Sequence, residues 1–130
     1  MANIAIVNSK VTALNAIQAL TLTAADEGVA GVAQTFVYTP TGKDNKISFV
    51  IYNKVAFAIT TEIKAGTGVF GAAAKADSVA ATALGTSIVQ IETGKYMQAN
   101  GTIEIKFTPA TGTKILTADH ALTVGVIELQ

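Results

Sequence analysis

The sequence predicts an all-β protein, an antiparallel β-sandwich of about eight strands with an immunoglobulin-like or jelly-roll-like arrangement. Three observations support this prediction. Apolar and polar residues alternate along several short stretches, as they do in strands with one buried face. Turn-forming residues separate these stretches at short intervals. The chain is also rich in Thr, Val and Ile, residues that favour strands.

The clearest expected strand is the stretch GTIEIKFT at residues 101–108. Successive side chains of a strand point to opposite faces, so its apolar residues share one face and its polar residues share the other. The apolar face holds Ile103, Ile105 and Phe107, and the polar face includes Glu104 and Lys106. We therefore expect a half-buried strand with one hydrated face.

Further strands are expected on both sides of this one. The stretch 55–64 alternates in the same way, whereas 46–52 is nearly all apolar and is expected to be covered on both faces. The long stretch 120–129 contains Gly125, which indicates a bulge or a close backbone approach. The weaker expected strands are 3–7, 17–23, 32–38 and 86–92.

The two prolines of the chain stand in similar corners, TPTGK at 39–43 and TPATGTK at 108–114. Proline pushes the residue before it to extended φ/ψ and lacks the N–H group that a sheet requires, so each corner ends the strand that precedes it. The Thr-Gly pair then turns the chain toward the next strand. We interpret the repetition as convergent turn chemistry rather than an internal duplication, because the flanking strands do not match.

Other connections are shorter. Asn53 and Lys54 separate two strong strands, which predicts a two-residue hairpin connection. Residues 92–95 and the pair Asn100-Gly101 are expected to be turns.

Two stretches keep a helical alternative. Residues 9–20 have Ser9 as a candidate N-cap and apolar residues at helical spacing, and residues 72–84 are rich in Ala. The length of 130 residues fits one domain. We expect a single sandwich domain over 1–130, with residues 1–10 as an extended N-terminal arm.

The composition disfavours several classes of function. Only 14% of the residues are charged, well below the usual quarter or so. The formal net charge is zero, and all nine basic residues are Lys; without Arg or a basic patch we expect no nucleic-acid binding. A weakly charged surface favours association, so we expect a homo-oligomer. The start of the chain lacks a secretory signal pattern and no run is apolar enough for a bilayer, so we expect synthesis in a cytoplasm and no membrane partner.

The stretch GTGVFG at 66–71 matches the spacing of a dinucleotide-binding fingerprint. The strand expected before it alternates apolar with polar residues, whereas the central parallel strand of that motif is apolar on both faces. We therefore interpret the stretch as a glycine loop that presents Val69 and Phe70.

No catalytic or metal-binding arrangement is expected. His120 is the one histidine and is adjacent to Asp119; neighbouring residues of a strand point to opposite faces, so this pair does not form part of a triad. The chain has no Cys and its acidic residues are scattered, so we predict no metal and no cofactor. A sugar-binding platform made of Tyr38, Tyr52 and Tyr96 stays as a minor alternative to core packing.

From residue 36 to the end, the chain resembles small virion proteins of tailed phages that decorate or stabilise the head. The resemblance rests on the pattern of FVYTPTGKDNKISFVIYN, GTGVFG, TSIVQIETGKYMQANGTIEIKFTPATGTK and the closing VGVIEL. It implies a non-enzymatic β-sandwich, often a trimer, that binds the lattice of the major capsid protein on the capsid exterior of the virion. The alternatives are a bacterial assembly or adhesion module, of the fibre or surface-layer type, and then an enzyme or sugar-binding module.

Two segments are the candidate contact sites on this interpretation. The N-terminal segment is apolar and alternating, and is suited to pairing with a strand edge of a neighbour. The glycine loop offers apolar anchors on a backbone that permits close approach. The candidate interaction residues are Asn3, Ile4, Ile6, Val69 and Phe70.

Overall fold

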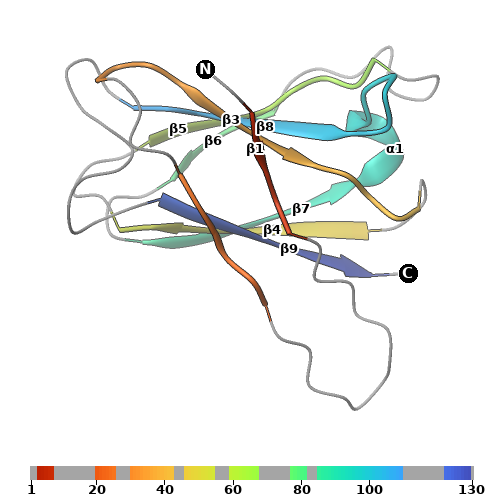
Figure 1. Cartoon of the computed structure of the whole chain (residues 1–130), viewed down its shortest axis with the longest axis horizontal. Coiled ribbons are helices and arrows are strands. Elements are labelled where there is room, and N and C mark those ends of the chain that lie inside the picture. The colour runs from red at the N-terminus through yellow and green to blue at the C-terminus, as the bar shows by residue number, and fades with distance from the viewer. Residues whose placement is uncertain are drawn as a thin grey trace.

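Two β-sheets packed face to face make up the fold in the computed structural model (Figure 1). The structure describes residues 3–7, 20–25, 30–42, 46–54, 59–67, 77–81, 85–109 and 122–129. Sheet A has the order β1-β3-β8-β5-β6, formed by Ile4–Ala5, Gln34–Tyr38, Ile103–Thr108, Ile59–Ile63 and Asp77–Ala81. Sheet B has the order β2-β9-β4-β7, formed by Thr23–Ala24, Leu122–Leu129, Lys46–Asn53 and Thr86–Glu92. The predicted all-β sandwich is confirmed.

The strand pairs are antiparallel, except that β1 runs parallel to β3. The chain changes sheet between successive described strands at every connection but the one from β5 to β6. Neighbours within a sheet are therefore mostly distant in sequence. No helix in the described ranges is long and apolar enough to cross a membrane.

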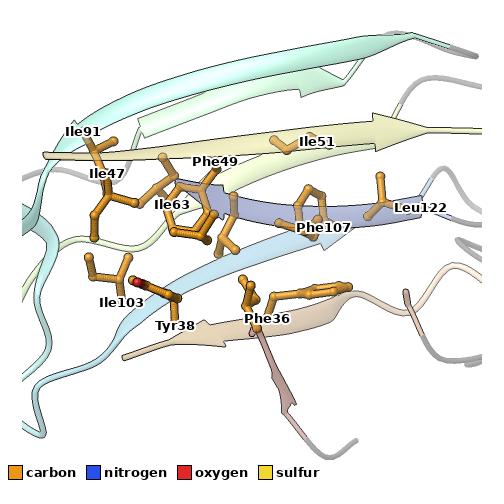
Figure 2. Packing of buried hydrophobic residues seen from close by; sticks show 14 of the residues in the cluster. Phe36, Tyr38, Ile47, Phe49, Ile51, Ile63, Ile91, Ile103, Phe107 and Leu122 are labelled. Atoms are coloured by element: carbon orange, nitrogen blue, oxygen red, sulfur yellow. The ribbon is translucent and has the colours of Figure 1, made fainter. Parts of the chain in front are cut away.

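The core lies between the inner faces of the two sheets (Figure 2). Alternation along each strand turns every second side chain inward, and Phe36, Phe49 and Phe107 are fully buried. Phe36 and Phe107 meet edge to face within sheet A, with ring centroids 5.3 Å apart. Tyr38 of sheet A meets Phe49 of sheet B in the same geometry at 6.5 Å. These edge-to-face contacts connect neighbouring strands and the two layers.

Both proline corners end their strands as predicted. Strand β3 ends at Tyr38, directly before Thr39-Pro40, and β8 ends at Thr108, directly before Pro109. The strands that follow, β4 and β9, both lie in sheet B. Strand β3 pairs with β8 in sheet A, and β4 pairs with β9 in sheet B. The two corners therefore begin on neighbouring strands of one sheet and lead to neighbouring strands of the other.

The hairpin predicted at Asn53 and Lys54 is wrong. Strand β4 belongs to sheet B and β5 to sheet A, so the chain passes between the sheets after Asn53. Asn53 is fully buried, and its N–H donates to the Gly85 carbonyl at 2.9 Å. Asn-Lys lacks the glycine that a tight hairpin turn with positive φ favours, and a hairpin would have kept both strands in one sheet.

Other local predictions need correction too. Residues 77–81 form strand β6, so the helical alternative for 72–84 is wrong over that part; the stretch 9–19 lies outside the described residues. A turn was expected over residues 92–95, but Thr93–Tyr96 form the one-turn helix α1, at the end of the sandwich between β7 and β8 (Figure 1). Burial of Tyr96 at 3% exposure stabilises this turn more than local propensity does.

Strand β4 is covered less than predicted. Its inner residues are fully buried, but Ser48, Val50 and Tyr52 on its second face are only half-buried. The ladder between β4 and β9 runs without a break through Gly125, so there is no bulge. The close approach expected there exists, but it is made by leucine side chains, as described below.

We expect Phe107→Ala to lower the free energy of unfolding by about 3–5 kcal/mol, because it removes a buried ring from the core. Glu104→Ala, on the outer face of the same strand, should cost less than about 1 kcal/mol, since its ion pair with Lys64 is partly exposed to solvent. Chemical denaturation of both variants measures the difference. Equal losses would contradict the inward direction of Phe107.

Candidate interaction surface

The outer faces of the two sheets differ in chemical character. On sheet A, outward side chains of β8 form ion pairs with Glu62 of β5 and with Lys64, the residue directly after β5. Lys64 Nζ lies 3.2 Å from Glu104, and Lys106 Nζ lies 3.6 Å from Glu62. Charged, hydrated side chains of this kind resist burial against another protein. The outer face of sheet A is therefore the charged face of the sandwich.

The outer face of sheet B carries an apolar row instead. Val50 in the middle of β4 lies opposite Ile88 of β7 on one side and Gly125 of β9 on the other. Leu20 and Leu22, just before β2, pack on Gly125. We call these five residues the apolar row. Ile88 is 69% exposed, which is unusual for an isoleucine in a strand.

Gly125 allows the two leucines to lie on the sheet. A Cβ atom at this position would stand 2.9 Å from a methyl carbon of Leu20 and of Leu22, closer than carbon atoms normally approach. Both leucines still remain 39% and 44% exposed. The glycine therefore extends the apolar row across β9 instead of leaving a gap there.

Uncharged residues, most of them polar, flank the apolar row. Ser48 of β4 lies between Gln90 and Ile127, and Tyr52 lies between Thr86 and Thr123. Charges occur only toward the ends of this part of the face. Lys46 lies opposite Glu92 at one end, and Lys54 Nζ lies 5.1 Å from the Tyr52 ring centroid at the other. An apolar centre with a polar rim is the usual plan of a protein contact surface.

A buried carboxylate fixes the first proline corner to sheet B. Glu128 on β9 is fully buried, and it accepts a hydrogen bond from the Thr41 N–H at 2.8 Å. The Thr41 hydroxyl donates to its second oxygen. Because a buried charge is costly without such donors, Glu128 holds the TPTGK corner in one position. The sequence contained no signal for this contact beyond an acidic residue at an inward position of β9.

Tyr38 lies close to this carboxylate. Its side chain is buried, and its hydroxyl has no hydrogen-bond partner within the described ranges, so Glu128 is near without meeting hydrogen-bond geometry. Burial raises the pKa of Tyr38 above its usual value of 10.0, and the negative charge of Glu128 raises it further. Tyr38 is therefore a neutral core residue and not an acid or base at ordinary pH.

The start of the GTGVFG stretch is fixed by a neighbouring turn. The Thr67 hydroxyl donates to Gln98 Oε1 at 3.0 Å and accepts the Ala99 N–H at 2.8 Å. Gln98 Nε2 donates to the Ala65 carbonyl at 2.9 Å. The turn itself closes through Gly101, which has φ of +85° and donates to the Gln98 carbonyl at 2.9 Å. The turn predicted at Asn100-Gly101 is thus confirmed.

This arrangement is not a dinucleotide site. Strand β5, which precedes the stretch, pairs antiparallel on both sides, with β6 and with β8. The fingerprint requires a parallel strand followed by a helix. Residues 68–76 lie outside the described residues, and they include two of the candidate contacts, Val69 and Phe70.

The three N-terminal candidate contact residues differ in their burial. Ile4 is half-buried in β1, pairs with Phe36 and packs against the core. Ile6 is 8% exposed and belongs to the core, and its N–H donates to the Val37 carbonyl at 2.9 Å. The prediction that Ile6 contacts a neighbour needs correction, because this fold already buries it. Asn3 is exposed and stays a candidate.

The remaining chemical candidates do not converge. Tyr38 and Tyr96 are buried, so they form no exposed sugar platform with Tyr52. His120 lies outside the described residues, and within the described ranges no three His, Cys, Asp or Glu residues gather as a metal site. Pattern analysis missed the apolar row because Ile88 shares its face of β7 with the polar residues Thr86 and Gln90, while its apolar neighbour Val50 comes from another strand.

Glu128→Ala should lower the free energy of unfolding by about 2–3 kcal/mol, since it removes the buried carboxylate that accepts hydrogen bonds from the Thr41 N–H and hydroxyl. Glu128→Gln keeps one acceptor oxygen and should cost about half as much. Thr41→Val, which keeps the N–H donor, is the matched control and should cost about 1 kcal/mol. Urea denaturation ranks the three variants. A Glu128→Ala protein as stable as wild type would show that this contact does not stabilise the corner.

Alkaline pH should destabilise the fold through Tyr38. Below pH 10 its hydroxyl is protonated in both the folded and the unfolded chain. Above that pH the unfolded chain loses the proton while the folded chain keeps it, so the free energy of unfolding falls as pH rises. Denaturation at a series of alkaline pH values measures the fall. Tyr38→Phe should remove part of it, and an unchanged profile in that variant would contradict the assignment.

Comparison of the chain with protein-family models, with curated proteins and with solved structures finds no match in any of the three.

Proposed function

We propose that this protein is a non-enzymatic structural component of a tailed-phage virion that decorates or stabilises the capsid by binding repeated sites on its lattice. The observation that carries the proposal is the difference between the two outer faces. One face has cross-strand ion pairs, whereas the other has an apolar row whose most prominent member, Ile88, is 69% exposed.

A protein surface is the partner that suits the apolar row. Val50, Ile88 and Gly125 lie on paired strands of one sheet, and Leu20 and Leu22 pack on Gly125. The backbone beneath the row is therefore largely ordered before binding, so less conformational freedom is lost on contact. The lattice repeats the same site many times, so weak individual contacts are sufficient if copies are linked. The zero formal net charge lets many copies lie close together without strong repulsion.

The test is co-sedimentation of the purified protein with undecorated capsids of the virus that encodes it. Wild-type protein should bind saturably, in a fixed ratio to capsid subunits. Ile88→Asp and Leu22→Asp place a charge at two separate points of the apolar row, and each should weaken binding about tenfold or more.

Val7→Asp is the matched control, because Val7 is also an exposed apolar residue, 50% exposed, but follows β1 of sheet A. It should bind as wild type does. Loss of binding in Val7→Asp with full binding in Ile88→Asp would move the contact to the N-terminal segment. No binding by wild-type protein to mature or expanded shells would reject the capsid proposal and favour an assembly or adhesion module.

A further inference from the structure

Strand β7 has an open edge that is longer and less protected than the other described edges. Among the described strands it ends sheet B and pairs only with β4, and it runs for seven residues, whereas β1 and β2 have two residues each and β6 has five. Natural edge strands are usually interrupted by proline, lysine or a bulge. β7 has none of these, and its one charged residue, Glu92, is its last.

The direction of the backbone groups on this edge follows from one hydrogen bond. The Asn53 N–H donates to the Gly85 carbonyl at 2.9 Å, in register with the β4–β7 ladder. Backbone groups of an antiparallel strand alternate between its two sides. Gly85 and every second residue after it therefore face β4. The N–H and carbonyl groups that face outward belong to Thr86, Ile88, Gln90 and Glu92.

We propose that β7 pairs antiparallel with β7 of a second copy of this chain, so that two four-stranded B sheets become one continuous sheet. The register that uses all four outward-facing residues places Ile88 opposite Gln90 of the second copy, and Thr86 opposite Glu92. Val89 then lies on the two-fold axis. Each opposed pair exchanges both backbone hydrogen bonds, as in any antiparallel ladder.

The charges of β7 favour a second copy in this register. The two Glu92 carboxylates lie at opposite ends of the joined strands, about 20 Å apart, so they do not repel each other strongly. Each Glu92 faces the Thr86 hydroxyl of the second copy. Tyr52 of that copy lies opposite Thr86 on the next strand, about 10 Å from Glu92. The Lys54 ammonium lies over the Tyr52 ring, so a positive charge is near each Glu92.

The apolar side chains favour the same arrangement. Directly opposed residues of an antiparallel pair point to the same face, so both outer faces lie on the same side of the joined sheet. Ile88, exposed by 69% in the single chain, lies diagonally beside Ile88 of the second copy, within reach of contact. The two apolar rows then form one surface with two equivalent halves.

The first test uses sedimentation velocity on the full chain without capsids, up to about 100 µM. Wild-type protein should be a dimer. Gln90→Pro removes an outward N–H that takes no part in the β4–β7 ladder, and it should be a folded monomer because proline is tolerated on the open side of an edge strand. Gln90→Ala keeps the N–H and should remain a dimer. Leu22→Asp, near the opposite edge of sheet B, should also remain a dimer, which separates this inference from capsid binding.

The second test fixes the register by cross-linking. The chain has no cysteine, so Ile88→Cys combined with Gln90→Cys places sulfurs opposite each other only across the proposed pair. Mild oxidation should give a covalent dimer. Ile88→Cys alone should not cross-link efficiently, because its sulfurs are then diagonal neighbours. A wild-type monomer at all concentrations, a trimer, a dimer that persists in Gln90→Pro, or a double-cysteine variant that stays uncross-linked would each overturn the inference.

Discussion

The central constraint on this fold is that each sheet can bury only one face, so the two inner faces must close on each other. The four strands that satisfy it are joined in pairs: β3 and β8 at the centre of sheet A, β4 and β9 at the centre of sheet B. A Thr-Pro corner leads from each strand of the first pair to one of the second. The two corners therefore make the same kind of connection, from a central strand of sheet A to a central strand of sheet B. This shared position explains why their sequences are similar although the strands around them differ.

Local pattern predicted what depends on local geometry. The alternation at 103–108 and the proline after it determine which residues are buried and where β8 ends, and both were readable from the sequence. Pairing partners were not readable, because they join residues far apart in the chain. This is why the connection after Asn53 was misassigned. The candidate surface was harder still: the apolar row combines residues of four segments, and the role of Gly125 becomes visible only once Leu20 and Leu22 lie over it.

The two outer faces of the sandwich differ in charge and in exposed apolar surface. Ion pairs keep the face of sheet A hydrated, while the neutral face of sheet B leaves large apolar side chains accessible. The buried Glu128 supports this second face from the inside, because it fixes the corner that leads into β4, the strand that carries Val50. Structural rigidity and surface character thus come from the same strands, with inward residues holding the sheet and outward residues available for contact.

The repeated change of sheet along the chain also has a kinetic consequence. Almost every described strand pairs with a strand that is distant in sequence, so little native structure can form from local contacts alone. Such high contact order slows folding, because the chain loses conformational entropy on closing long loops before the stabilising contacts between the strands have formed. Among the described strands, the antiparallel β5–β6 pair, joined within one sheet, is the most local pairing, whereas β2 with β9 pairs Thr23 with Val124, residues that are far apart in the chain. A chain built in this way should refold slowly for its size, with its open strand edges exposed during that time.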